Sequence, residues 1–138
     1  MPAKDIYHDD VKIALEKDGW TITKDPLVLQ WGSKDLFVDL GAEKLLAAQR
    51  QNEKIAVEIK SFAGSSQVND LEKAVGQYIV YRNILEEIET DRVLYLAIPK
   101  KAFQDIFSEP LGSLVLRKNQ LNLLVFIPQT QEVMQWIP

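Results

Sequence analysis

The segment IAVEIKSF, residues 55–62, places Glu58 and Lys60 two positions apart in an otherwise apolar run that is typical of a buried strand. Side chains alternate along a strand, so the two charges share one face and the other face is aliphatic. A second apolar run, LFVDLGA, contains Asp39. Because burying an unpaired carboxylate is costly, Asp39 needs a partner.

If the two runs pair as adjacent strands, Asp39 and Glu58 lie side by side with Lys60 beyond them. Neighbouring carboxylates repel and raise each other's pKa, and a hard divalent cation relieves the repulsion most directly. With the backbone carbonyl of Ile59, the pair offers three oxygen ligands for Mg²⁺ or Mn²⁺. Such a site hydrolyses phosphodiesters, with Lys60 orienting the nucleophile or stabilising the transition state.

A purely structural interpretation stands beside this one. Lys60 can bridge Asp39 and Glu58 as an ion-pair cluster without any metal, since buried charges are usually paired. A Glu-x-Lys pattern in a strand is by itself a weak signal. Its weight rises here because it follows an aspartate in an apolar run by one hairpin.

Composition limits the classes of protein and of site. The 138 residues are 46% hydrophobic, which predicts a single domain over residues 1–138. The absence of cysteine excludes disulfides and thiolate metal sites, and the single histidine, His8, excludes a multi-histidine cluster. The net charge of −4 gives no overall attraction to DNA. We find no membrane span and no apolar core of a secretion signal in MPAKDIYHDD, and expect a cytoplasmic protein.

The elements that must position these residues can be read along the chain. DDVKIALEKDGW predicts a helix ending at Gly19, and WTITKDPLVLQ a β segment broken at Pro26. LFVDLGA and KIAVEIKSF predict buried strands, and the intervening EKLLAAQRQNEK a hairpin with an irregular or helical loop. A long amphipathic helix is predicted from an N-cap at Asn69.

The strand RVLYLAIP, a short helix around AFQDIFS, the strand LNLLVFIP and the segment EVMQWIP follow. The order α, β, β, β, α, β with a smaller α/β tail predicts a mixed central sheet flanked by helices.

Trp136 and Ile137 are expected to close the core or a subunit interface. Two cation pairs are expected at the surface, where DNA binding needs some such charges: Lys100 with Lys101, and Arg117 with Lys118.

This constellation resembles the PD-(D/E)xK nuclease superfamily, which implies a restriction endonuclease-like fold with Asp39, Glu58 and Lys60 as its catalytic residues. Val38 stands where that pattern often has proline. In the Holliday-junction-resolvase branch an early acidic residue of the first helix is a further metal ligand, and His8 holds that place here. Either His8 binds a metal, or Asp9 or Asp10 substitutes, or the site is weakened.

Two supporting positions follow from the resemblance. Gln77 matches a glutamine that many superfamily members carry in the helix after the E-x-K strand, and helical geometry sets it near Lys73 and Tyr81. It either faces the cleft or is an ordinary solvated residue. Glu43 either supports the cleft or caps a loop.

Longer strings resemble the XisH family of fdxN element excision controlling factors of cyanobacteria: DGWTITKDP, VDLGAEKLLAAQ, IAVEIKSF, AVGQYIVYR and DRVLYLAIP. This resemblance implies a role in programmed DNA excision during heterocyst differentiation, with an XisI-like partner and a site-specific recombinase. It leaves three hypotheses open. The chain is a metal-dependent DNA endonuclease, a catalytically silent assembly protein, or a toxin-like nuclease restrained by its partner. We also expect a homo-oligomer.

Overall fold

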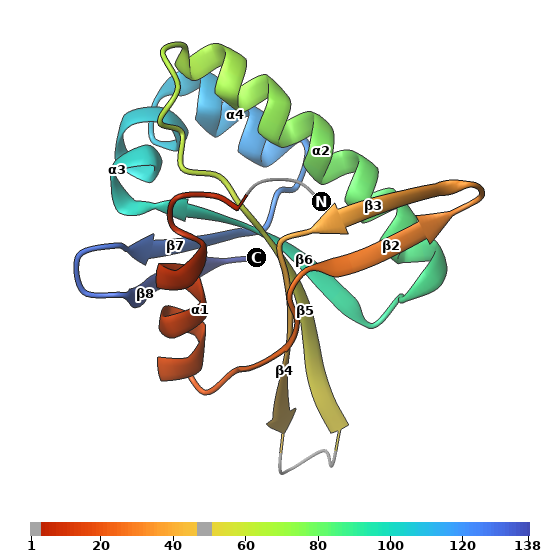
Figure 1. Cartoon of the computed structure of the whole chain (residues 1–138). Coiled ribbons are helices and arrows are strands. Elements are labelled where there is room, and N and C mark those ends of the chain that lie inside the picture. The colour runs from red at the N-terminus through yellow and green to blue at the C-terminus, as the bar shows by residue number, and fades with distance from the viewer. Residues whose placement is uncertain (1–3, 47–50) are drawn as a thin grey trace.

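A six-stranded mixed sheet carries helices on both of its faces in the computed structural model, which describes residues 4–46 and 51–138 (Figure 1). The strands are β1 (Thr21–Lys24), β2 (Leu27–Trp31), β3 (Lys34–Val38), β4 (Leu40–Leu46), β5 (Gln51–Ile59), β6 (Arg92–Pro99), β7 (Leu123–Ile127) and β8 (Glu132–Ile137). The helices are α1 (His8–Lys17), α2 (Gln67–Ile88), α3 (Lys100–Ala102), the π-helical η1 (Phe103–Phe107) and α4 (Pro110–Lys118). None of the described helices is long and apolar enough to cross a membrane.

The sheet has the strand order β1-β4-β5-β6-β7-β8. The inner pairs β5–β6 and β6–β7 are parallel, and the pairs β1–β4, β4–β5 and β7–β8 are antiparallel. Strands β2 and β3 form a separate antiparallel hairpin that projects beside α2 (Figure 1). The mixed α/β architecture expected from the order of elements is therefore confirmed.

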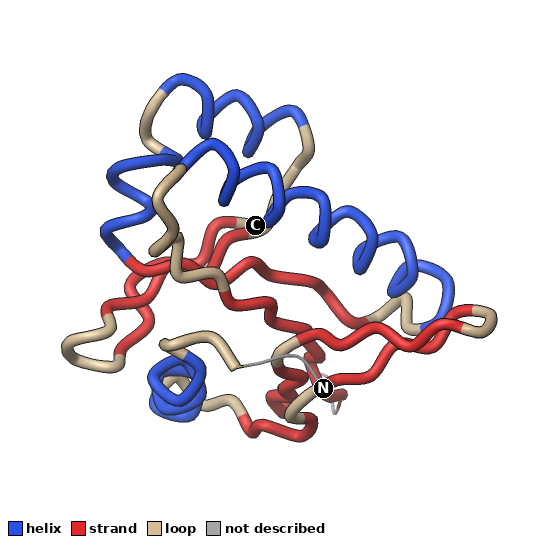
Figure 2. Tube along the Cα trace, turned by 45° about the horizontal axis from the view of Figure 1, so that its top comes forward, coloured by secondary structure: helices blue, strands red, loops and turns tan. Residues whose placement is uncertain are grey.

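The alternation along β5 divides the core into two layers. Ala56 packs on the side of α2, whereas Ile55, Val57 and Ile59 pack on the side of α1. Figure 2 shows α2 and α4 over one face of the sheet and α1 over the other. Glu58 shares the α2 face with Ala56, so the strand carries its charge toward the long helix.

Most of the expected elements are present. Helix α1 ends where predicted, with Gly19 in the left-handed region at φ +92°. The β segment is interrupted at Pro26 between β1 and β2. Trp136 packs against Trp20 and Tyr95, with ring centroids 5.8 and 4.9 Å apart, and so closes the core. The expected surface cations at Lys100, Lys101, Arg117 and Lys118 are exposed.

Three expectations about the elements need correction. LFVDLGA is not one strand, because Asp39 separates β3 from β4, which belong to different sheets. The N-cap of α2 is Ser66, whose hydroxyl accepts the Asn69 backbone N–H, so the cap is three residues earlier than predicted. Helix α4 was not predicted as a separate element; Pro110 stands at its start.

The hairpin between β4 and β5 is also more extended than expected. Strand β4 continues to Leu46 and β5 begins at Gln51, so much of EKLLAAQRQNEK is strand. The loop predicted within it falls on residues 47–50, which lie outside the described residues. The predicted helix around AFQDIFS is present as α3 followed by the π-helical η1.

Candidate functional site

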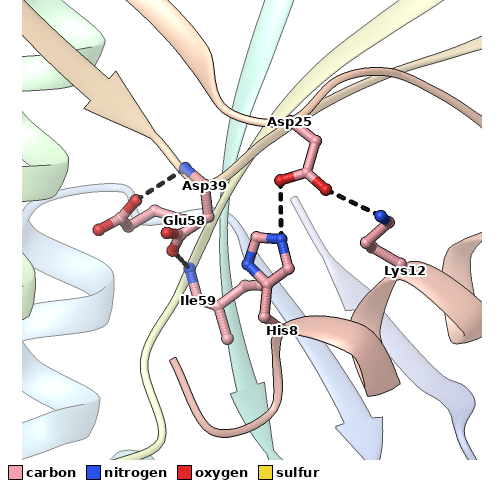
Figure 3. Close-up of polar contacts among 6 residues, drawn as sticks. All are labelled: His8, Lys12, Asp25, Asp39, Glu58 and Ile59. Carbon is pink, nitrogen blue, oxygen red and sulfur yellow. Dashed lines mark hydrogen bonds and ion pairs between the residues drawn. The ribbon is translucent and has the colours of Figure 1, made fainter. Parts of the chain in front are cut away.

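Asp39 and Glu58 meet where the β4–β5 ladder ends. Leu40 is opposite Val57 in the antiparallel register, which sets Asp39 across from Glu58. The backbone N–H of Asp39 donates to Oε1 of Glu58 at 3.2 Å, and the N–H of Ile59 donates to Oδ2 of Asp39 at 2.7 Å (Figure 3). Each carboxylate therefore accepts a backbone N–H of the other strand, where a regular ladder would have backbone–backbone bonds. The predicted convergence of Asp39 and Glu58 is found.

Lys60 lies beyond this pair, as its spacing predicts. Its ammonium is 3.4 Å from Oε2 of Glu58. Glu58 is buried, with a side chain 6% exposed, whereas the Lys60 side chain is 27% exposed. Solvent therefore reaches Lys60, and half-buried Asp39, more readily than Glu58.

The peptide between Ile59 and Lys60 presents its carbonyl to the same place. The N–H of Lys60 donates to the carbonyl of Ala97 in β6 at 2.9 Å. In a trans peptide the C=O points opposite to the N–H, so the Ile59 carbonyl points away from β6 and toward the side of Asp39. Oxygen atoms from Asp39, Glu58 and Ile59 thus gather at one edge of the strand pair.

The charges of the pair are not balanced. Burial, followed by the negative charge of Asp39, raises the pKa of Glu58 to about 8. Burial also raises the pKa of Asp39, against the opposing hydrogen bond from Ile59 N–H. Lys60 lowers the pKa of both carboxyls by a smaller amount than burial raises them. At neutral pH the pair therefore holds a proton, mainly on Glu58.

Tyr81 is a site residue that sequence reasoning missed. It lies buried on α2, and burial, with the charges of Glu58 and Asp39, raises its pKa to about 12. The phenol therefore remains protonated beside the acidic pair. The sequence gives no signal for this residue, because Tyr81 looks like an ordinary core residue of the predicted helix.

His8 lies at the start of α1 and is buried, with 4% of its surface exposed. Its Nε2 is 2.8 Å from Oδ1 of Asp25, and Lys12 Nζ donates to Oδ2 of the same carboxylate at 2.8 Å. The other ring nitrogen, Nδ1, is buried and has no hydrogen-bond partner among the described residues. Figure 3 draws the ring beside Asp39 and Ile59.

The remaining predicted residues are not brought to the pair. Asp9 is exposed on α1, and Oδ1 of Asp10 accepts a hydrogen bond from Gln131 at 2.8 Å. Gln77 is exposed on α2. Glu43 lies further along β4, where its Oε1 accepts a hydrogen bond from Asn52 at 3.3 Å across the hairpin.

The oxygen set fits a divalent cation only with help from backbone and solvent. No three His, Asp or Glu side chains within residues 4–46 and 51–138 form a cluster able to hold a metal ion. Two carboxylates, a carbonyl and waters are nevertheless the ligands that Mg²⁺ and Mn²⁺ use where a phosphate also binds. Burial is the main cause of the raised carboxyl pKa values, and a bound cation would offset this cost of ionising the pair.

Two hollows adjoin the site. The smaller, about 150 Å³, is lined by residues that include Lys60, Ser61 and Lys73. The larger, about 610 Å³, shares Ser61 with it and extends to Lys100 and Lys101. Space and positive charge therefore continue from Lys60 along the ends of the parallel strands, although acidic residues also line both hollows: Asp5, Asp70 and Asp105.

Fold and site together define a small mixed α/β protein whose sheet carries a half-buried aspartate, a buried glutamate and a lysine at the end of an antiparallel strand pair. Residues 1–134 match the family described as XisH protein. The chain therefore belongs to the XisH family. Comparison with curated proteins gives no match.

Two crystal structures of relatives show the same fold. An XisH family protein from Nostoc punctiforme is 39% identical, with a TM-score of 0.88 over 97% of this chain and 100% of that chain. An fdxN element excision controlling factor protein from Anabaena variabilis is 40% identical, with a TM-score of 0.88 over 98% of this chain and 100% of that one.

Proposed function

We propose that the chain is a divalent-metal-dependent DNA endonuclease with a restriction endonuclease-like fold that acts in programmed DNA excision. The observation that carries the proposal is the convergence of half-buried Asp39 with buried Glu58, each accepting a backbone N–H of the other's strand, beside the Lys60 ammonium. A protein gains nothing in stability from a buried carboxylate, that of Glu58, set against a second carboxylate. Their placement is explained by a cation that binds both.

In this proposal Asp39, Glu58 and the Ile59 carbonyl hold Mg²⁺ or Mn²⁺. The cation supplies a bound water of lowered pKa and charge compensation at the phosphate. Lys60, partly exposed beside Glu58, orients the attacking water or stabilises charge on the phosphate oxygens. Tyr81 stays protonated next to the pair and keeps a hydroxyl donor available there. The hollow from Lys60 toward Lys100 receives the DNA backbone.

The biological setting of the proposal comes from the relatives. The Anabaena relative is an fdxN element excision controlling factor protein, and we extend that role to this chain. We further propose that this excision takes place during heterocyst differentiation, as the family resemblance implies. A net charge of −4 disfavours strong unaided binding to DNA. We therefore include an XisI-like partner, a site-specific recombinase and self-association in the proposed cytoplasmic complex.

The test is cleavage of supercoiled, branched and single-stranded DNA with Mg²⁺ or Mn²⁺, with and without the XisI-like partner. Glu58→Gln and Lys60→Met are compared with wild type. Glu53→Gln and Lys54→Met on the same strand serve as matched controls, since both residues lie away from the pair. The proposal expects cleavage in wild type and both controls, and at least about a hundredfold loss in the two site variants. Equal activity in all five preparations would contradict it.

A second candidate function is a nuclease-fold assembly protein without catalysis. The hairpin β2–β3 favours it, because Val28 and Trp31 are 47% and 52% exposed there. Exposed apolar side chains of this kind commonly contact partners. Under this alternative, Glu58→Gln and Lys60→Met leave binding to the XisI-like partner intact, Trp31→Ala weakens it, and no preparation cleaves DNA.

A further inference from the structure

The cluster of His8, Asp25 and Lys12 is built beside the acidic pair, not within it. Asp25 lies in the turn between β1 and β2, and accepts from Lys12 through one oxygen and from His8 through the other, both at 2.8 Å. His8 and Lys12 are one helical turn apart on α1, so they reach Asp25 from the same face.

The contacts of Asp25 decide which nitrogen of His8 carries hydrogen. The Lys12 ammonium, which can only donate, lies 2.8 Å from Oδ2 of Asp25 and favours its charged form, while His8 Nε2 lies 2.8 Å from Oδ1. Asp25 is therefore a carboxylate, which only accepts, so Nε2 of His8 must carry the hydrogen that lies between them. In the neutral ring, Nδ1 is then left with a free lone pair.

That lone pair is buried and unpartnered. Nδ1 has no hydrogen-bond partner within the described chain, although His8 is only 4% exposed. Figure 3 shows the ring between Asp25 on one side and Asp39 with Ile59 on the other, and Nδ1 is on the side of Asp39. A buried acceptor without a donor is unfavourable, so the position calls for a hydrogen-bond donor or a cation.

We propose that Asp25, itself fixed by Lys12, locks His8 in the tautomer that offers Nδ1 to the cation bound at Asp39, and that the site therefore prefers a transition-metal dication to Mg²⁺. The inference rests on the cation site of the proposed function. His8 reaches this cation from the side of Asp39 and the Ile59 carbonyl, and Glu58 completes the set; without the cation, the three side chains form no metal cluster within residues 4–46 and 51–138. Imidazole nitrogen binds Mn²⁺, Co²⁺ or Ni²⁺ in preference to Mg²⁺, which favours oxygen.

The direct test measures binding of Mn²⁺, Co²⁺ and Mg²⁺ by calorimetry, together with pulsed electron paramagnetic resonance of bound Mn²⁺. Wild type is expected to bind Co²⁺ and Mn²⁺ more tightly than Mg²⁺ and to show a ¹⁴N coupling to Mn²⁺. His8→Gln offers oxygen in place of nitrogen. It should remove the coupling and weaken Co²⁺ binding about tenfold or more, with little effect on Mg²⁺.

Asp25→Asn provides a sharper variant because it changes only the hydrogen-bond pattern. Lys12 can only donate, so it draws the amide oxygen of Asn to itself and leaves the NH₂ group facing Nε2 of His8. The ring must then accept at Nε2 and carry its hydrogen at Nδ1. This variant is expected to lose the ¹⁴N coupling and the Co²⁺ preference, as His8→Gln does.

The double variant Lys12→Met with Asp25→Asn frees the amide to turn its oxygen toward Nε2. It should restore both the coupling and the Co²⁺ preference, a rescue that a general loss of folding would not produce. Unfolding curves confirm that each variant is native. If His8→Gln leaves the Co²⁺ to Mg²⁺ ratio and the coupling unchanged while cations still bind, the inference is wrong and the cation site stands. If no cation binds to wild type, the proposed function fails as well.

Discussion

Two buried charged groups occupy opposite ends of the β5–β6 strand pair and are arranged in opposite ways. At one end, Arg92 donates to Glu89 at 2.6 Å and to the carbonyl of Ile55 at 2.9 Å. At the other end, Glu58 faces Asp39, and burial together with like charge raises its pKa to about 8. The first group satisfies its charge within the chain, whereas the second sets two carboxyl groups against one partly exposed ammonium, that of Lys60.

The contrast separates a structural charge from a functional one. Both Arg92 and Glu58 are buried, at 8% and 5% exposure, so burial alone does not distinguish them. The two residues differ in their partners. A buried charge that is paired with an opposite charge stabilises the fold, whereas two like charges destabilise it unless a ligand binds them. Variants at the two ends should therefore change stability in opposite directions.

The largest effect is expected from Arg92→Ala. The substitution leaves the Glu89 carboxylate and the Ile55 carbonyl without their donor, and breaking a buried pair costs about 3–5 kcal/mol. Urea unfolding should show this loss at neutral pH. Lys54→Ala is the control, since its ion pair with the exposed Asp91 is open to solvent and its loss should cost under about 1 kcal/mol. Similar losses of unfolding free energy in Arg92→Ala and Lys54→Ala would show that Arg92 is not a stabilising buried charge.

A divalent cation should stabilise the acidic end. At a concentration about 100 times its dissociation constant, Mg²⁺ or Mn²⁺ should raise the free energy of unfolding by about 2.7 kcal/mol. Asp39→Asn should abolish the increase, because it removes one anionic ligand. Thermal unfolding with and without the cation measures both. An equal increase in Asp39→Asn would show that the cation binds elsewhere.

Without a cation, Glu58→Gln should stabilise the protein at alkaline pH. The native pKa of Glu58 lies above its ordinary value of 4.5, so the native state binds the proton more tightly than the unfolded state. Wild-type stability therefore falls as pH rises from about 4.5 to about 8. The amide removes this loss, which at about 1.4 kcal/mol per pKa unit is worth up to about 5 kcal/mol at pH 9. Chemical unfolding at pH 5 and pH 9 measures the difference in unfolding free energy between Glu58→Gln and wild type. A variant no more stable than wild type at pH 9 would contradict the account.

Lys60→Met should have the smallest effect on stability. Lys60 is partly exposed and 3.4 Å from Glu58, so losing the pair should cost under about 1 kcal/mol. Since the ammonium lowers the pKa of Glu58, its removal should move the titration of that carboxyl to higher pH. Carboxyl ¹³C NMR follows this directly, and an unchanged or lower midpoint would show that the lysine does not act on Glu58.

The acidic end is also the part of the molecule that sequence reasoning predicts best. Alternation with period two sets Glu58 and Lys60 on one face, and a hairpin brings an aspartate from the preceding strand beside them. Both are local rules, which hold whatever surrounds the strands. The long helix and the parallel strands follow from equally local patterns of apolar residues.

What the sequence does not predict depends on contacts between distant segments. Nothing in the pattern indicates that Asp25, in a turn, meets His8, which is 17 residues away. Tyr81 looks like an ordinary core residue of a helix until its helix is placed over β5. The break at Asp39 is likewise invisible, because the residues on both sides are apolar and only their different partner strands separate them.

The central claim is that the Asp39–Glu58 pair holds a proton that a divalent cation replaces. Calorimetric titration of Mn²⁺ at pH 7, repeated in buffers of different ionisation enthalpy, measures the protons released on binding. The account predicts release of close to one proton by wild type, and a much smaller release by Glu58→Gln. Binding without proton release, or the same release from Glu58→Gln, would contradict it.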